Sequence, residues 1–260
     1  MSLLESVLVL AAGVFAGAIN TIVGSGTLVT FPVLLAVGYG PVVANVSNTV
    51  GLVPGSVSGA IGYREELAGQ RHRALVLASA SLIGGIAGAV LLLTLPDSAF
   101  EAIVPVLIAV ALVLVVFQPR LSRALATRRA RARPHGGPLL WSGVFGTGIY
   151  GGYFGAAQGV ILLALLGITI PEEELQRLNA LKNVLAALVN GVAAVVFLFF
   201  ASVAWLPALL LAAGSAAGGQ LGARIGRRLS PAVLRGVIVL VGVAAIVVLG
   251  LVAIAVLVTR

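Results

Sequence analysis

The chain has 260 residues, of which 60% are apolar and 9% are charged, with 16 lysines and arginines against 8 aspartates and glutamates. Soluble domains are about 45 to 50% apolar and about 25% charged, so this composition excludes a soluble fold. The net charge of +8 fits nucleic acid, anionic lipid or the cytoplasmic face of a membrane protein, so its distribution along the chain decides between them. Cysteine is absent, which excludes disulfides and thiolate chemistry.

Apolar stretches predict the membrane spans. A bilayer core of about 30 Å needs roughly 20 apolar residues per helix. Eight stretches meet this requirement, at residues 3–35, 41–63, 74–95, 99–117, 139–170, 178–201, 206–223 and 233–258. The first and fifth are too long for one simple span and contain internal glycines, so we expect each to be a hairpin of two half-spans. The chain is therefore predicted to be an all-α integral membrane protein with up to ten helical segments.

The positions of the basic residues predict which ends of the spans lie in the cytoplasm, because loops rich in arginine and lysine stay there. The connection after the fourth stretch has no acid and six arginines, at positions 120, 123, 128, 129, 131 and 133. Counting spans from it places the turn with Asp97 and Glu101 outside. The first hairpin then enters from the outside and returns to it, whereas the second enters from the inside and returns to the inside. We expect a multi-pass protein of the cytoplasmic membrane with both termini outside.

An internal repeat relates the two halves of the chain. Residues 74–95 match residues 208–229 at a fixed offset of 134, with ten identities that include three glycines, at 84, 85 and 88 in the first half. Asn45 and Asn179 share the offset. Because the matching stretches cross in opposite directions, we predict two inverted repeats, each a broken-helix hairpin plus three transmembrane helices. They comprise residues 1–117 and 139–260, and the cytoplasmic, arginine-rich connection comprises 118–138.

Inverted repeats with broken helices are typical of secondary transporters. The alternative is an eight-helix protein with parallel repeats, which would leave one basic loop outside. The glycine spacing at Gly84 and Gly88 fits close helix crossing either within one chain or between the chains of a homodimer.

The hairpin tips, at residues 20–27 and 150–159, are the candidate binding region. Their small and polar residues propagate a helix poorly, and a helix that restarts there aims its N-terminal amides at the membrane centre, where they would bind an anion. The predicted substrate-binding residues at the tips are Asn20, Thr21, Gly24, Ser25, Gly26, Thr27, Tyr150, Gly151, Gly152, Tyr153 and Gln158. Those on the following helices are Asn45, Asn48, Thr49, Asn179, Lys182 and Asn183. The alternative roles are close packing for the small residues and interhelical hydrogen bonding for the asparagines.

Lys182 is the one base clearly inside a span, where it either supplies charge to the site or extends towards the cytoplasmic surface. No acid lies inside a span, which argues against a carboxylate proton relay. We find no nucleotide-binding lysine motif and no metal-ligand cluster, so we predict no enzyme activity, no cofactor and no metal. The expected partners are a small anion and the bilayer, with anionic lipids at the arginine-rich connection, and no nucleic acid.

Several motifs resemble those of the sulfite exporter TauE/SafE family. The first is Gly-Ala-Ile-Asn-Thr-Ile-Val-Gly-Ser-Gly-Thr-Leu-Val-Thr-Phe-Pro at 17–32, followed by Ala-Asn at 44–45 and Pro-Gly at 54–55. The second half contributes Ile-Tyr-Gly-Gly-Tyr-Phe-Gly at 149–155, Asn-Ala-Leu-Lys-Asn at 179–183, and Asn190. The resemblance covers nearly the whole chain apart from the arginine-rich connection, and the family's motif positions fall on the hairpin tips and helix starts named above.

The resemblance implies a permease for sulfite or an organosulfonate such as sulfoacetate. Together with the predicted repeats, it leads us to expect alternating access. We expect export, because an inside-negative potential favours expulsion of a monoanion by about 2.3 kcal/mol per 100 mV without a coupled ion. Uptake would need a coupled ion, with sodium held by carbonyl and hydroxyl oxygens as one candidate. Three alternatives stay open at this point. The tips would line a pore in an anion channel, a permease of the same design would carry a small carboxylate without sulfur, and a structural or signalling membrane protein would bind no anion.

Overall fold

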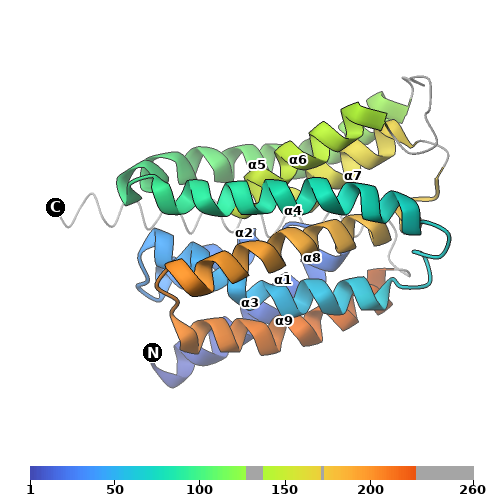
Figure 1. Cartoon of the computed structure of the whole chain (residues 1–260). Coiled ribbons are helices and arrows are strands. Elements are labelled where there is room, and N and C mark those ends of the chain that lie inside the picture. Colours follow the sequence, from blue (N-terminus) through green and yellow to red (C-terminus); the bar gives the residue numbers. More distant parts are fainter. Residues whose placement is uncertain (127–136, 171–172, 227–260) are drawn as a thin grey trace.

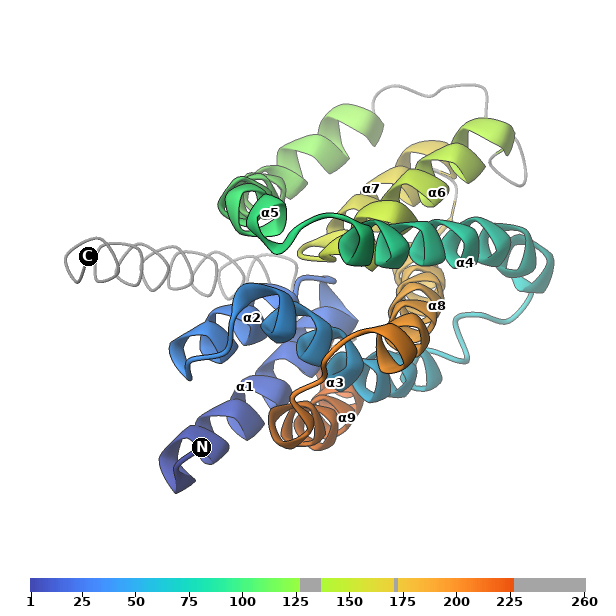
Figure 2. The same cartoon turned by 60° about the vertical axis from the view of Figure 1, so that its left-hand side comes forward.

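The fold is a bundle of helices, and a computed structural model describes it for residues 1–126, 137–170 and 173–226. No strand occurs in these ranges. The helices are α1 (Leu3–Ile22), α2 (Thr27–Ala36), α3 (Pro41–Gly62), α4 (Arg71–Thr94), α5 (Asp97–Ala126), α6 (Gly137–Tyr153), α7 (Gln158–Thr169), α8 (Leu175–Phe200) and α9 (Trp205–Gly226). Figures 1 and 2 show them in two views. The predicted stretch at 233–258 and the C-terminus lie outside the described residues.

Four of the helices, α1, α4, α8 and α9, are long and apolar enough to cross a bilayer. Their outward-facing side chains are large and apolar, as at Leu3, Phe199 and Phe200, which are more than three-quarters exposed. Such surface would be unfavourable in water and suits lipid. The predicted all-α integral membrane protein is confirmed. Helix α5 continues through Ala126, so the beginning of the arginine-rich connection is helical.

Both over-long stretches break where the sequence predicts a hairpin. The N–H groups of Val23 and Gly24 both donate to Ile19 O, and those of Phe154 and Gly155 both donate to Tyr150 O. Gly24 and Gly155 have φ angles of +89° and +76°, a conformation that ends a helix at little steric cost only for glycine. The arms are unequal, because α1 has 20 residues and is long enough for a full span, whereas α2 has 10.

Corresponding described helices of the two halves run in opposite directions. Helices α3 and α8 begin at Pro41 and Leu175, and α4 and α9 begin at Arg71 and Trp205, so both pairs are 134 residues apart, the offset of the sequence repeat. In Figure 1, α4 runs from right to left and α9 from left to right, and the two hairpins enter the bundle from opposite ends. Inverted repeats require such directions, and the repeat itself stays a prediction.

The repeated glycines let each half pack against the first helix of the other. A Cβ added at Gly88 of α4 would lie 2.0 Å from Ile149 O of α6, and one added at Gly218 of α9 would lie 2.0 Å from Val14 O of α1. Only glycine permits backbones to approach this closely. The glycine pairs therefore serve helix crossings within one chain.

Charged residues gather at the two ends of the bundle. Arg64, Arg71 and Arg177 lie at one end, called the basic end, and Glu5 and Asp97 lie at the opposite end, called the acidic end (Figure 1). Loops of both halves meet at the basic end. Arg73 Nη1 lies 2.9 Å from Glu173 Oε2, and Arg177 Nη2 donates to Ala68 O at 3.0 Å.

Candidate functional site

The two hairpin tips touch inside the bundle through glycine backbones. A Cβ added at Gly24 would lie 2.2 Å from the Gly159 Cα, and one added at Gly159 would lie 2.4 Å from the Gly24 Cα. The Gly159 N–H donates a hydrogen bond to Gly24 O at 3.0 Å. We call this contact, made by residues 23–26 and 154–159, the tip crossing. It brings the predicted residues of both tips into one buried region.

The last carbonyls of α1 are covered by one face of α8. Lys182 Nζ donates to Asn20 O and to Thr21 O, each at 3.1 Å. The side-chain amides of Asn179 and Asn183 also donate to Thr21 O, at 3.3 and 3.1 Å. The three donors share a face because residues three and four apart are neighbours on a helix. Lys182 is 0% exposed, so the alternative in which it extends to the surface is wrong.

The end of α6 is covered in the same way from the other half. The side-chain amide of Asn45 donates to Tyr153 O at 2.9 Å. Asn45 and Asn179 are the pair that share the offset of 134. Each therefore satisfies a carbonyl at the end of a broken helix of the opposite half, a group that has no partner within its own helix.

The position that corresponds to Lys182 in the first half is Asn48, and its contacts differ. The Asn48 amide donates to Thr27 Oγ1 at 3.3 Å, and its oxygen accepts a hydrogen bond from Thr30 Oγ1. Asn48 thus holds the start of α2 instead of facing α6. Thr49 donates to Asn45 O of its own helix at 2.9 Å. Thr30 is not predictable from the sequence, because nothing in the pattern indicates that α3 and α2 meet there.

Helices α2 and α7 both begin at the tip crossing and leave backbone N–H groups without acceptors. Among the described residues, the N–H groups of Ser25, Gly26, Thr27, Ala156 and Ala157 donate no hydrogen bond. All five residues are buried. The N-terminal end of a helix carries partial positive charge and favours an anion. The tip crossing therefore presents a set of donors that suits a small anion.

Side chains add further polar atoms without partners. Five predicted site residues have such a buried atom, namely Thr21 Oγ1, Asn45 Oδ1, Tyr153 OH, Gln158 Nε2 and Asn179 Oδ1. A buried polar group left unsatisfied costs about 1 to 3 kcal/mol. Proteins seldom tolerate several of these in one region unless a ligand or water satisfies them. Their concentration around the tip crossing supports a binding site there.

Some predicted residues support the second tip instead of facing a ligand. The Tyr150 hydroxyl donates to Ala156 O and closes the turn between α6 and α7. A Cβ at Gly151 would lie 2.4 Å from Gln158 Cδ, so this glycine makes room for the glutamine side chain. A Cβ at Gly152 would lie 2.2 Å from Gly85 O of α4, so Gly152 serves helix packing.

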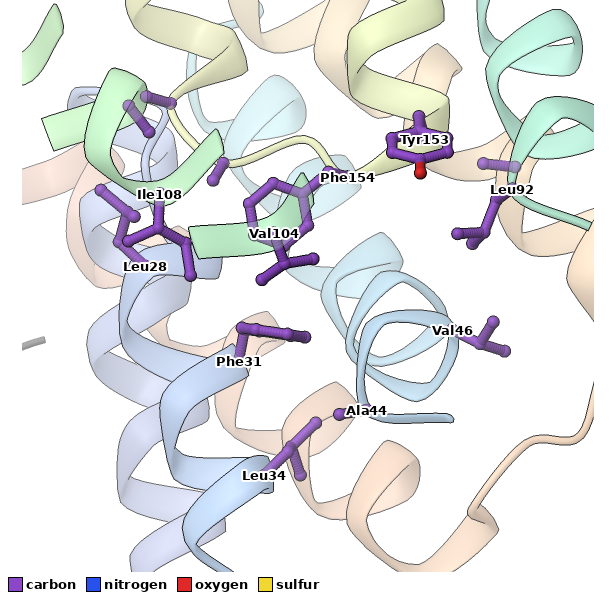
Figure 3. Close-up of a cluster of buried hydrophobic side chains, with 14 of the residues drawn as sticks. Leu28, Phe31, Leu34, Ala44, Val46, Leu92, Val104, Ile108, Tyr153 and Phe154 are labelled. Carbon is purple, nitrogen blue, oxygen red and sulfur yellow. The ribbon is translucent and has the colours of Figure 1, made fainter. Parts of the chain in front are cut away.

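Aromatic rings cover the tip crossing towards the acidic end. Phe31 of α2 and Phe154 of the second tip meet edge to face, with ring centroids 5.2 Å apart. Phe100 in the first turns of α5 lies 5.5 Å from the ring of Tyr153 and 6.0 Å from that of Phe154. Figure 3 shows Phe154 directed towards Phe31 and Val104. Phe31 and Phe100 are not predictable as site residues, because an aromatic residue in a span carries no signal that distinguishes this role from lipid contact.

Ion pairs cover the basic end. Glu173 accepts hydrogen bonds from Arg73 of the first half and Arg177 of the second. The hydrogen bond from Arg73, followed by that from Arg177, holds the pKa of the Glu173 carboxyl below its usual value, against the opposing effect of burial. The loops of the two halves are thereby tied together on the side of the tip crossing opposite to the aromatic rings.

Comparison with known proteins identifies the family. The model of the family described as sulfite exporter TauE/SafE matches residues 9–249. A probable membrane transporter protein from Sinorhizobium sp., ORF9, is 30% identical over 241 residues, covering 90% of this chain and 87% of the relative. The probable membrane transporter protein YfcA of Escherichia coli K12 is 28% identical over 227 residues, covering 87% and 82%. No solved structure matches the chain. The chain therefore belongs to the sulfite exporter TauE/SafE family and is a membrane transporter.

Proposed function

We propose that the transporter carries a small oxyanion, sulfite or an organosulfonate such as sulfoacetate, and that the anion binds at the tip crossing. One observation carries this proposal, the five buried backbone N–H groups of Ser25, Gly26, Thr27, Ala156 and Ala157 that lie at or next to the tip crossing without acceptors. A sulfite or sulfonate group offers three oxygen atoms to such donors. The family description, sulfite exporter, supports a sulfur oxyanion as the substrate.

The electrostatics of the region favour a negatively charged group. Backbone donors stabilise an anion without the cost of burying several fixed charges. Lys182 contributes the one cation, and its side chain passes close to Gly159, since a Cβ at Gly159 would lie 3.1 Å from Lys182 Cδ. Ser25 and Gln158 add side-chain donors and are 2% and 3% exposed. No aspartate or glutamate lies near the middle of the described helices to repel the anion.

Alternating access is the mechanism that this arrangement supports. The tip crossing is covered by the aromatic rings on one side and by the Arg73, Glu173 and Arg177 cluster on the other. A carrier requires cover of this kind at both ends, and opening one end at a time exposes the site to one side of the membrane. An open pore lined by both tips would leave the polar residues of the tips exposed to water.

The direction of transport follows from the membrane potential. With the basic end in the cytoplasm, as the positive-inside rule places it, an inside-negative potential favours outward movement of a monoanion by about 2.3 kcal/mol per 100 mV. Export then needs no coupled ion. The proposed carrier resides in the cytoplasmic membrane with its N-terminus outside.

Thermal unfolding of the purified protein in detergent tests binding. Sulfite and sulfoacetate should raise the melting temperature, simple carboxylates should do so less, and taurine, which carries an added positive charge, least. Replacing Gln158 with Leu should weaken sulfite binding by at least about tenfold, the factor that corresponds to 1.4 kcal/mol. Gln220→Leu is the matched control, because Gln220 donates to Ser58 O on α3, away from the tips. Equal anion affinity in both variants would contradict the placement of the site.

Flux into proteoliposomes separates the carrier from a channel. A carrier gives flux that saturates with sulfite concentration and accelerates when unlabelled anion is present on the far side. Flux that rises linearly, together with single-channel currents, would refute alternating access. The absence of any anion-dependent shift in melting temperature would refute anion binding altogether.

A further inference from the structure

The only lysine of the chain lies in the membrane interior, at position 182, and it has no acidic partner among the described residues. Its ammonium group contacts two backbone carbonyls at the C-terminal end of α1, Asn20 O and Thr21 O, each at 3.1 Å. We propose that this end of α1 is a binding site for a monovalent cation and that the Lys182 ammonium occupies it. This inference goes beyond the proposed function, because it concerns the cation and holds for any transported anion.

The chemistry of the surrounding atoms is that of a cation site. The C-terminal end of a helix carries partial negative charge, and in transporters the ends of broken helices bind coupling cations through their carbonyl oxygens. Two further oxygens, Thr21 Oγ1 and Asn179 Oδ1, are buried without hydrogen bonds. The Asn179 amide nitrogen donates to Thr21 O, which keeps its oxygen in the same region. Carbonyl, hydroxyl and amide oxygens are the ligands that sodium prefers over nitrogen or sulfur.

Among the described residues, no acidic side chain faces the Lys182 ammonium in addition to the helix-end carbonyls. The helices packed against α8 are α3, α4, α6 and α7, and Lys182 of α8 also contacts the end of α1. Their titratable or charged groups are Glu5 at the acidic end of α1, Arg71, His72 and Arg73 at the basic end of α4, and Tyr150 and Tyr153 on α6. None of these is an acid that faces Lys182. Helix α8 itself adds only Arg177, at the basic end, which binds Glu173.

The first half of the chain has no such built-in cation. Its corresponding residue is Asn48, which is neutral and bonds to Thr27 and Thr30 of α2. The carbonyl of Tyr153 at the end of α6 receives only the amide of Asn45. The lysine is therefore a feature of one broken helix and is not needed to end a broken helix in this fold. It follows that wild-type transport should be independent of sodium and potassium.

Removal of the ammonium group tests the proposal. Lys182→Ala leaves the carbonyl oxygens facing a space that a small cation can enter. Melting temperatures are measured at constant ionic strength in sodium, potassium, ethylammonium or choline chloride, choline being the bulky control. The wild type should melt at one temperature in all four salts. Lys182→Ala should melt lower in choline and should regain roughly 3 to 6 °C in saturating sodium or ethylammonium, as linkage predicts for a ligand that binds only the folded state.

Asn48→Ala is the matched control, because it removes a buried amide at the equivalent position without emptying a cation site, and its melting temperature should not depend on the salt. A Lys182→Ala protein that folds and melts equally in all four salts would overturn the proposal.

Where Lys182→Ala does not fold, the sulfite flux of the wild-type protein is the test. Sulfite flux that falls when choline replaces sodium on both sides would show that the cation site is not filled, and unchanged flux supports the proposal. Anion-induced stabilisation of the wild type reports on the proposed substrate separately.

Discussion

Gly159→Ala is the substitution that tests the tip crossing most directly. The added methyl group would lie 2.4 Å from the Gly24 Cα, 3.1 Å from Lys182 Cδ and 3.2 Å from Val23 O. Ordinary contact between such atoms begins near 3.4 Å, so the tips must separate by about 1 Å. The hydrogen bond from the Gly159 N–H to Gly24 O would lengthen beyond its normal range.

The expected loss of stability combines three effects. Overpacking against backbone costs about 1 to 3 kcal/mol, and the lost hydrogen bond costs about 1 kcal/mol. Alanine returns about 0.5 to 1 kcal/mol through its better helix propensity. The net destabilisation is about 1 to 3.5 kcal/mol. Gly167, in the same helix, has nothing within 4 Å of its added Cβ, so Gly167→Ala keeps only the favourable effect and should stabilise by about 0.5 to 1 kcal/mol.

Thermal unfolding followed by tryptophan fluorescence measures the difference. For a chain of this size, each kcal/mol of stability shifts the melting temperature by roughly 2 to 4 °C, so Gly159→Ala should melt about 3 to 18 °C below Gly167→Ala. Sulfite flux should be lost in the first variant and retained in the second. A Gly159→Ala protein as stable as Gly167→Ala would refute the contact between the tips.

Three further predictions use the same assays. Gly24→Ala should destabilise the protein more than Gly38→Ala. Both glycines have a positive φ angle, which costs alanine about 1 to 2 kcal/mol, but only at Gly24 would the added Cβ meet backbone, at 2.2 Å. Equal losses of stability would contradict this contact. Asn45→Leu should cost about 1 to 3 kcal/mol, since it leaves a helix-end carbonyl unpaired, and an unchanged melting temperature would exclude that role. The pKa of Glu173 is lowered by Arg73, so the ion pair stabilises the folded protein fully above the ordinary pKa range of glutamate, and this stabilisation is lost as the pH falls through the lowered pKa. Glu173→Gln should therefore remove this part of the pH dependence of the melting temperature. An unaltered pH dependence would argue against the ion pair.

The hairpins and the helix-end asparagines are predictable from the sequence. The breaks at Gly24 and Gly155 follow from apolar stretches too long for one span, since a glycine-rich interruption within lipid must be buried in protein. The bonds from Asn45 and Asn179 to carbonyls of the opposite half match the interhelical hydrogen bonding that is the alternative role for these asparagines. What the pattern lacks is the direction of each side chain, which tertiary packing decides.

Lys182 and the arginine-rich connection illustrate this limit. The lysine lies about 9 Å along α8 from Gln176, at 1.5 Å per residue, and this distance suits both a buried site and extension to the surface. Only the end of α1, which covers it, decides between them. In the connection, arginines are good helix formers, so their run does not reveal where α5 ends.

The contact between Ser56 and Asn190 locates the centre of the two halves. These residues are 134 apart, the offset of the repeat, and the Asn190 amide donates to Ser56 Oγ at 3.0 Å. Residues related by a twofold axis touch each other only close to that axis, so this bond lies where inverted repeats require the axis to pass. The Asn20 amide, next to the tip crossing, also donates to Ser56 Oγ, at 3.3 Å. The alternating access proposed above would be a rocking motion about such an axis. Because Asn48 and Lys182 occupy corresponding positions and only the second is basic, the two end states of that motion would differ in energy, and an anion bound near the lysine would change that difference.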